Sequence, residues 1–270
     1  MEHEILLDVR HLTHIFPLSR KTAVKAVDDV SFQIRRGEIF GLVGESGSGK
    51  STAARCVMNI YQPYAGQIYY KGIDTCDRGQ FRKNKKMLQT TRQMIFQDSG
   101  SSLNQKMKVR DIIEEPMRVQ KIRPLRGSYE EEARFQMKYV GLDPEYLKKY
   151  PGELSGGQRQ RVAIARMLIA KAPIMIFDDS LSAVDADTDV RIRRALRSKM
   201  KDATVILISH RITTLMEADQ ILVLNHGVIE ECGTHQQLIH HGGIYQKIYE
   251  IQLNQDDRRL LNEGGDSDAE

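Results

Sequence analysis

The sequence predicts an α/β fold with an antiparallel β subdomain and an inserted α-helical subdomain. Three features of the chain lead to this prediction. A glycine-rich motif at residues 44–52 lies between an apolar run of strand length and a helical run. Two further apolar runs, 174–177 and 205–208, indicate strands buried in an α/β core. Residues 98–152 are charged and follow a helical pattern, which predicts a helical segment inserted into that core.

The composition sets limits on the class of protein. With 270 residues, of which 40% are apolar, the chain can bury one sizeable core. Its net charge of +4 is small for this length and gives no argument for nucleic-acid binding. The three cysteines are widely scattered and have no metal-type spacing, which is typical of apolar fillers in a reducing compartment. No signal-peptide core begins the chain and no apolar run approaches the roughly 18 residues of a membrane span, so we expect a soluble or peripheral, cytoplasmic protein.

The glycine-rich motif predicts a nucleotide-phosphate site. Residues 44–52 read GESGSGKST and fit G-x-x-x-x-G-K-[ST], between a predicted strand at 38–43 and a predicted helix at 53–60. Its glycines let successive N–H groups turn inward, and the helix N-terminus adds its positive end. We expect the Lys50 ammonium to reach the β- and γ-phosphates and the Ser51 hydroxyl to ligate Mg²⁺. The predicted nucleotide-binding residues of this loop are Gly44, Ser46, Gly47, Ser48, Gly49, Lys50, Ser51 and Thr52.

The N-terminal part predicts a pair of strands and a candidate base contact. Residues 5–9 and 30–34 alternate in polarity, which favours antiparallel strands beside the nucleotide strand. Phe16 lies between them, about one strand pair upstream of the phosphate loop, where an aromatic ring can stack on adenine. The residues fit a plain core role for Phe16 equally well.

The middle of the chain predicts shorter elements. Residues 65–72 indicate a hairpin, and the basic run 78–86 is typical of a solvated helix. The apolar run 94–96 predicts a short buried strand that ends on Gln97.

A second anion-binding helix start is predicted at residues 154–158, which read LSGGQ and precede a helical run from Arg159 to Ala170. Ser155 stands where an N-cap belongs, and the glycines expose N–H groups at the helix end. The predicted binding residues here are Ser155, Gly156, Gly157 and Gln158.

Two polar pairs end the buried strands. Asp178 and Asp179 follow the strand at 174–177, and an acidic pair in this position suits a Mg²⁺ ligand plus a general base. Ser209 and His210 follow the strand at 205–208.

The C-terminal part predicts a closing hairpin and a tail. Residues 221–224 and 228–230 flank an Asn-His-Gly turn, and a last helix is expected over about 236–252. Residues 253–270 lose the apolar pattern and gain six acids against two arginines, which predicts a disordered acidic tail. We therefore expect a nucleotide-binding domain over 1–252.

At LSGGQ, together with the phosphate loop and Asp178, the sequence resembles the ATP-binding subunits of ABC transporters over residues 4 to about 248. The resemblance implies a P-loop NTPase (RecA-like) core whose helical subdomain carries the LSGGQ signature. It also implies ATP and Mg²⁺ as ligands and head-to-tail closure of two nucleotide domains. Each ATP would then lie between the phosphate loop of one subunit and the signature of the other.

The family's site residues carry over to matching positions. The resemblance implies Mg²⁺ contacts by Ser51, Gln97 and Asp178, with Gln97 also coupling to the membrane partner. It implies hydrolytic roles for Gln97, Asp179 and His210, the last contacting the γ-phosphate. Ser155 and Gly157 would bind the γ-phosphate held by the opposite subunit. Residues 182–185 resemble the loop that crosses the dimer interface.

One position departs from the family pattern. Members that hydrolyse ATP efficiently usually have Asp-Glu where this chain has Asp178-Asp179. The aspartate side chain is shorter by one methylene, so its carboxylate stands about 1.5 Å back from the attacking water. Misplacement of about 1 Å can cost roughly 10²-fold in rate. We therefore predict a slow or helper site, with an efficient site supplied by a partner subunit.

Two sets of segments in the chain resemble two different types of ABC transporter. Residues 24–72, 95–116 and 150–155 resemble the oligopeptide, dipeptide and nickel importers, and the second of these follows Gln97, near the expected membrane partner. Residues 178–185, 208–215 and 233–235 resemble exporter nucleotide domains. Exporter domains commonly follow six membrane spans, whereas this chain starts at the first strand, which favours an importer subunit.

The leading interpretation is an ATPase subunit for peptide- or nickel-type uptake. Its partners would be a second nucleotide-binding subunit, integral membrane permease subunits and an extracytoplasmic substrate-binding protein, with no nucleic acid. It would be peripheral on the cytoplasmic face of the membrane. The alternatives are an exporter nucleotide domain, a regulatory subunit that barely hydrolyses ATP, and a soluble non-transport ABC ATPase, which usually has tandem domains or coiled-coil insertions.

Overall fold

A computed structural model describes residues 4–19, 22–97, 102–180 and 203–263. Its central sheet has six strands in the order β10-β9-β3-β8-β7-β6, and all but β10 run parallel to their neighbours. The strands are β3 (Ile39–Val43), β6 (Arg92–Ile95), β7 (Ile174–Asp178), β8 (Thr204–Ile208), β9 (Gln220–Asn225) and β10 (Val228–Gly233). Because the carboxyl ends of parallel strands meet at one edge, this sheet gathers the residues that follow β3, β6, β7 and β8.

A second sheet has four antiparallel strands in the order β2-β1-β4-β5. These strands are β1 (Ile5–Pro17), β2 (Ala23–Arg35), β4 (Ala65–Tyr70) and β5 (Ile73–Asp74). The sequence placed β1 and β2 beside the nucleotide strand, but they belong to this separate sheet. The physical reason is that β3 has no open edge, since β8 and β9 pair with it on its two sides.

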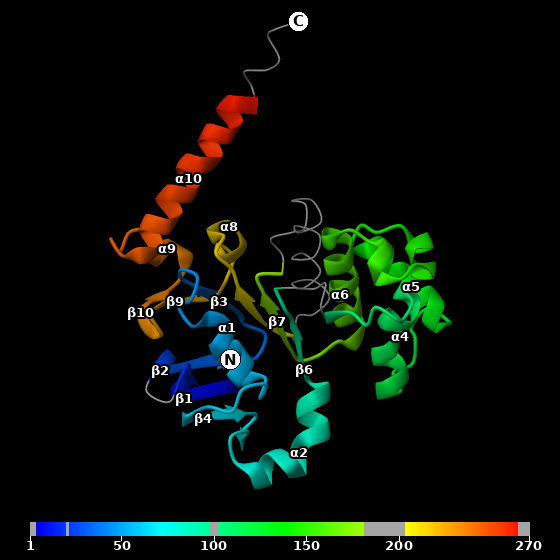
Figure 1. Cartoon of the computed structure of the whole chain (residues 1–270), viewed down its shortest axis with the longest axis horizontal. Coiled ribbons are helices and arrows are strands. Elements are labelled where there is room, and N and C mark those ends of the chain that lie inside the picture. The colour runs from blue at the N-terminus through cyan, green and yellow to red at the C-terminus, as the bar shows by residue number, and fades with distance from the viewer. Residues whose placement is uncertain (1–3, 20–21, 98–101, 181–202, 264–270) are drawn as a thin grey trace, which may run out of the picture.

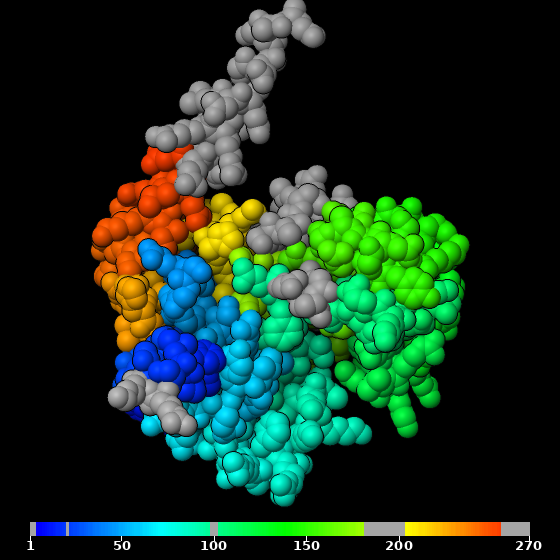
Figure 2. Space-filling model, viewed as in Figure 1, coloured from blue at the N-terminus to red at the C-terminus, as the bar shows by residue number. Residues whose placement is uncertain are grey.

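The helices fall into two groups around these sheets. Helix α1 (Lys50–Val57) follows β3, and the basic helix α2 (Arg78–Thr90) leads into β6. Between β6 and β7 lie α4 (Val109–Gln120), α5 (Tyr129–Tyr139), the 3-10 turns η1 (Pro144–Lys148) and η2 (Pro151–Glu153), and α6 (Gly156–Ala170). Figure 1 shows α4, α5 and α6 together on one side of the sheets, and Figure 2 shows their green surface as one side of the molecule.

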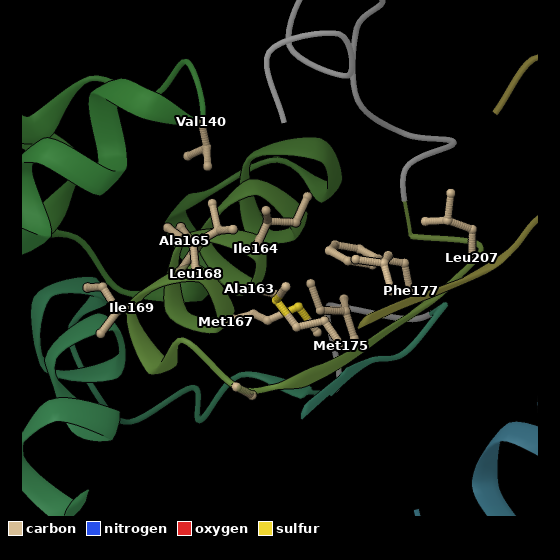
Figure 3. Close-up of a cluster of buried hydrophobic side chains, with 14 of the residues drawn as sticks. Val140, Ala163, Ile164, Ala165, Met167, Leu168, Ile169, Met175, Phe177 and Leu207 are labelled. Carbon is tan, nitrogen blue, oxygen red and sulfur yellow. The ribbon is translucent and has the colours of Figure 1, made fainter. Parts of the chain in front are cut away.

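Buried side chains form two clusters on opposite faces of the central sheet. Along β7, Met175 and Phe177 belong to the cluster that includes α6, whereas Ile174 and Ile176 belong to the cluster that includes β1 and α1. Figure 3 shows Met175 and Phe177 facing the apolar side chains of α6. Burial on both faces explains why this strand is apolar from Ile174 to Phe177.

The C-terminal part differs from the single helix and tail expected from sequence. Helix α8 (Ile212–Leu215) follows β8, and after β10 the chain forms α9 (His235–Leu238) and then α10 (Ile244–Glu263). Gly242, with φ of +77°, lies in the break between α9 and α10. Helix α10 continues past the expected end at Gln252, and its later residues include three Leu and two Arg, which have good helix propensity. The last residues, 264–270, lie outside the described part of the chain.

Candidate functional site

The phosphate loop lies between β3 and α1, and neighbouring backbone fixes its shape. Gly44 and Gly49 have φ of +147° and +101°. A Cβ atom on Gly44 would strike the backbone oxygen of Leu224, and one on Gly49 would strike that of Ala26. Only glycine fits these two positions, so the motif is required by the packing of the loop against β9 and β2.

The backbone N–H groups at the start of α1 can bind an anion. Gly49 is its N-cap and makes no side-chain cap hydrogen bond. The first N–H groups of a helix have no partner within the helix, and they attract negative charge. The loop therefore presents the kind of backbone cradle that binds phosphate.

Lys50 places a positive charge inside this loop. Its ammonium donates to the carbonyl oxygens of Gly44 at 2.8 Å and Glu45 at 2.7 Å, and to Ser48 Oγ at 3.1 Å. Burial lowers the pKa of Lys50, while the nearby carboxylates of Asp178, Asp179 and Glu45 act in the opposite direction. The ammonium is thus held over the loop, where a phosphate group would lie.

Ser51 and Asp178 meet in a manner that suits a bound cation. Ser51 Oγ donates to Asp178 Oδ1 at 2.7 Å, and Asp178 is 1% exposed. Among the residues that the structure describes, Asp178 Oδ2 has no hydrogen-bond partner, and the Arg55 guanidinium lies 4.0 Å from it. Burial is the main cause that raises the pKa of Asp178, and the hydrogen bond from Ser51 opposes it. A buried carboxylate oxygen without a partner is costly, and coordination of a metal ion would relieve that cost.

The donor set fits Mg²⁺ bound together with a substrate phosphate. Within the described residues there is no group of three or more His, Cys, Asp or Glu side chains that could hold a metal. Mg²⁺ is commonly held by one or two carboxylates, substrate phosphates and water. A serine hydroxyl and one carboxylate, next to a phosphate cradle, match this pattern.

Asp179 and His210 form a hydrogen-bonded pair at the same sheet edge. Asp179 follows β7, His210 follows β8, and Asp179 Oδ2 lies 2.8 Å from His210 Nδ1. Asp179 has φ of +47°, and its N–H donates to the carbonyl oxygen of Ile208 at 2.8 Å. Aspartate is among the few residues that adopt this left-handed region readily.

Gln97 lies at this edge as well. It follows β6, and Ile95 of that strand pairs with Phe177 of β7. Its side chain is exposed. The register therefore brings Gln97 to the sheet edge that holds the aspartate pair, and no contact between Gln97 and Asp178 is found among the described residues.

The predicted signature begins α6. Ser155 Oγ accepts from Gln158 N at 3.2 Å, and Gln158 Oε1 accepts from Ser155 N at 2.9 Å, which completes a capping box. Ser155 and Gly156 are exposed. Within the part of the chain that the structure describes, the hydrogen bonds of residues 155–158 are local and none reaches the phosphate loop. The two predicted anion sites therefore do not meet in one chain.

Phe16 lies in an aromatic cluster near the loop. Its half-buried ring is edge-on to His14, with centroids 4.6 Å apart, and to Tyr61, at 5.4 Å. It pairs with Val24 on β2, two residues from Ala26, whose carbonyl oxygen contacts Gly49. Sequence reasoning missed His14 and Tyr61; the i, i+2 spacing of His14 and Phe16 along one strand face was the available signal.

Sequence reasoning also missed two supports of the aspartate pair. Arg55 of α1 is near Asp178, and its guanidinium also lies over the ring of Tyr61. Gln160, which is 3% exposed on α6, donates to the carbonyl oxygen of Ser180. The predicted interface loop at 182–185 lies outside the described residues.

The comparisons with known proteins agree with this geometry. The family model for ABC transporters matches residues 27–182, more than half of the chain. The chain belongs to the ABC transporter family. The predicted P-loop NTPase core is confirmed, and this ABC protein is an ATP-binding, ATP-hydrolysing subunit.

Several relatives of this ABC subunit carry transport names. It is 39% identical over 238 residues to the putative oligopeptide transport ATP-binding protein YkfD of Bacillus subtilis, covering 85% of this chain and 71% of that protein. It is 36% identical to the oligopeptide transport ATP-binding protein OppF of Streptococcus mutans, covering 87% and 77%. It is also 34% identical to the ATP-dependent lipid A-core flippase of Pseudomonas fluorescens, covering 92% of this chain but 40% of the flippase.

Solved structures give the same fold. A bacterial Atm1-family ABC exporter with ATP bound superposes with a TM-score of 0.76 at 27% identity, over 93% of this chain and 42% of the exporter. A dimeric ATP-binding cassette with ADP and Pi bound superposes with a TM-score of 0.75 at 25% identity, over 84% and 98%. None of the helices that the structure describes combines the length and apolar composition needed to cross a bilayer.

Proposed function

We propose that this ABC subunit powers peptide- or nickel-type uptake, through ATP-driven closure of two nucleotide domains against permease subunits. The observation that supports it most is the run of relatives named for oligopeptide and dipeptide transport, each of which this chain covers by more than two thirds. The segment from Leu103 to Pro116, which resembles the importer branch, agrees with these names.

In the proposed cycle the phosphate loop binds ATP. Lys50 and the N–H groups around Gly49 hold the β- and γ-phosphates, and Phe16 stacks on adenine. Ser51, Asp178 and Gln97 hold Mg²⁺, which neutralises charge on the phosphates when it is bound. The buried Oδ2 of Asp178, which has no hydrogen-bond partner within the described ranges of the chain, supports this ligand set.

The signature would complete the site across a dimer. The exposed N-terminus of α6, at Ser155, Gly156, Gly157 and Gln158, binds the γ-phosphate held by a second nucleotide-binding subunit. The local hydrogen bonding of these residues and two dimeric structures of one similar cassette support this arrangement. Closure of the dimer moves the permease subunits, and an extracytoplasmic binding protein delivers the substrate. This places the protein on the cytoplasmic face of the membrane.

Hydrolysis in this proposal uses Asp179 and His210. Asp179 accepts a proton from water as the water oxygen attacks the γ-phosphorus, and the bond from that phosphorus to the β-γ bridging oxygen breaks. The products are ADP and inorganic phosphate. His210 donates to the γ-phosphate, and its hydrogen bond to Asp179 supports a shared position at the reacting group.

The test is complementation of uptake with a matched inactive variant. A strain that lacks this gene is supplied with wild type or Lys50→Ala, and uptake of labelled peptide mixtures and of ⁶³Ni²⁺ is measured. Wild type should restore one of these and Lys50→Ala should not. The tagged chain should also copurify with separate permease subunits. Copurification with a fused six-span exporter alone would overturn the proposal.

An exporter motor is the second candidate. The similarity to a lipid A-core flippase and to an Atm1-family exporter, together with residues 178–185 and 208–215, favours it. Accumulation of an export substrate in the deletion strain, with normal peptide and nickel uptake, would establish this alternative.

A further inference from the structure

We infer that Gln252 of α10 is a positioning residue for ATP hydrolysis, because its side-chain amide holds the backbone on which His210 is mounted. The inference rests on the proposed role of His210 at the γ-phosphate. The C-terminal helix α10, which lies outside the nucleotide-binding motifs, would then contribute to ATP turnover.

Both polar atoms of the Gln252 amide are used on the His210 segment. Gln252 Nε2 donates to the carbonyl oxygen of His210 at 2.6 Å, and Ile212 N donates to Gln252 Oε1 at 2.9 Å. Such two-point contact fixes the orientation of the segment more firmly than one hydrogen bond would. The two residues are 42 and 40 positions away along the chain, so this is a tertiary contact.

The segment needs such support. His210 lies two residues past the end of β8, and Arg211, the N-cap of α8, makes no side-chain cap hydrogen bond. The N–H of Ile212 is therefore one of the unsatisfied donors at a helix start, and Gln252 satisfies it from another helix. The neighbouring support is local: Arg211 N donates to Ser209 Oγ at 3.0 Å.

The contact of Gln252 is made to the backbone of His210, the residue whose ring is proposed to act at the γ-phosphate. The ring of His210 is bonded to Asp179, and its backbone carbonyl is bonded to Gln252, so the residue is held from both ends. The His210 side chain is 60% exposed, so packing contributes little to its position. Loss of the backbone contact would let the ring shift, and a shift of about 1 Å can cost roughly 10²-fold in rate.

Helix α10 is itself anchored, so Gln252 has a fixed base. Glu231 of β10 accepts from Ile244 N at 2.5 Å and from Tyr245 N at 3.2 Å, at the first turn of α10. His235 Nδ1 lies 2.9 Å from the buried Tyr245 hydroxyl. Gln252 is about 12 Å further along the helix, which then runs away from the body of the molecule (Figure 1).

The experiment compares steady-state and single-turnover ATP hydrolysis by the whole chain in six forms: wild type, Gln252→Ala, Gln252→Glu, Gln246→Ala, His210→Ala and the double variant Gln252→Ala/His210→Ala. Labelled-nucleotide binding and urea unfolding are measured beside them. Gln252→Ala removes both hydrogen bonds. Gln252→Glu keeps an acceptor for Ile212 N and loses the donor to the His210 carbonyl. Gln246→Ala is the matched control, because Gln246 is on α10 and bonds only to Gly242 and Glu250 among the described residues.

We expect Gln252→Ala and Gln252→Glu to lower kcat by about 5- to 20-fold, with KM and nucleotide affinity within about twofold of wild type. Gln246→Ala should leave kcat and the urea midpoint unchanged. Adding Gln252→Ala to His210→Ala should cost nothing further, because the two residues act as a unit.

Any of three results in the activity measurements would overturn the inference. These are an unchanged kcat in Gln252→Ala, full activity in Gln252→Glu, or a Gln252→Ala loss that multiplies with that of His210→Ala. A loss of kcat matched by a lower folded fraction in urea would also do so, since it would show a purely structural role. A fully active His210→Ala would instead refute the proposed role of His210, so the two failures are distinct.

Discussion

His210 Nδ1 lies 2.8 Å from Oδ2 of Asp179, and the two side chains differ sharply in exposure, at 60% and 16%. Asp179 thus faces the protein while His210 faces outward at the same sheet edge. A carboxylate and a histidine that are hydrogen-bonded next to a phosphate site suit general acid–base catalysis of hydrolysis. If Asp179 is the base of the proposed hydrolysis, we expect the length of its side chain to limit the rate of ATP turnover.

Asp179→Glu should raise the rate of ATP turnover by tenfold or more. The longer side chain moves the carboxylate about 1.5 Å toward the attacking water. The same change should lower the free energy of unfolding by about 1 kcal/mol, because φ at this position is +47° and glutamate is less tolerant of that region than aspartate. Turnover is measured with Lys50→Ala as the inactive control, and stability by urea unfolding. Brisk wild-type turnover that Glu hardly changes would show that Asp179 is already a competent base.

Gly156→Ala should reduce turnover at least tenfold while leaving the isolated chain stable. A Cβ atom on Gly156 would meet no atom of the described residues within 4 Å, and the residue has no positive φ. Alanine therefore fits this position without strain in that part of the chain. A loss of activity would therefore report a contact outside this chain, which the proposal assigns to the nucleotide on the opposite subunit. Gly152→Ala is the control, because its nearest atom is 3.9 Å away and it lies before the signature. Equal, undiminished activity in both variants would argue against binding across the dimer.

Arg92→Lys should lower the free energy of unfolding by about 2 to 4 kcal/mol. Arg92 is 3% exposed and donates to the carbonyl oxygens of Leu88 and Val57 and to Asn59 Oδ1, at 3.0, 2.7 and 2.9 Å. Burial lowers its pKa to about 10. Lysine cannot present the planar fork that reaches these acceptors together. Urea unfolding of this variant beside the exposed Arg82→Lys gives the comparison, and equal midpoints would contradict it.

Local signals explain what could be predicted from sequence. The phosphate loop and the N-cap at Ser155 are set by residues within one turn or loop, and the apolar run of β7 follows from burial on both faces. The placement of β1 and β2 in a second sheet depends on β8 and β9 occupying both sides of β3. No local sequence pattern indicates this long-range pairing. Gln252 looks like an ordinary polar residue of a solvated helix; its contacts with His210 and Ile212 exist only in the folded chain.

The stability of the protein should fall on acidification in a way that depends on His235. This histidine is 6% exposed, and burial lowers its pKa below the ordinary value of 6.5. As the pH falls below about 6.5, the unfolded chain binds a proton at this site before the folded chain does, so the free energy of unfolding decreases. That contribution is fully present above pH 6.5 and is lost progressively as the pH falls through the lower pKa of the folded state. His235→Gln removes the titrating group, so its urea midpoint should change less between pH 7.5 and 5.5 than that of wild type. The exposed His240→Gln should behave like wild type over this interval, and parallel curves for wild type and His235→Gln would contradict the prediction.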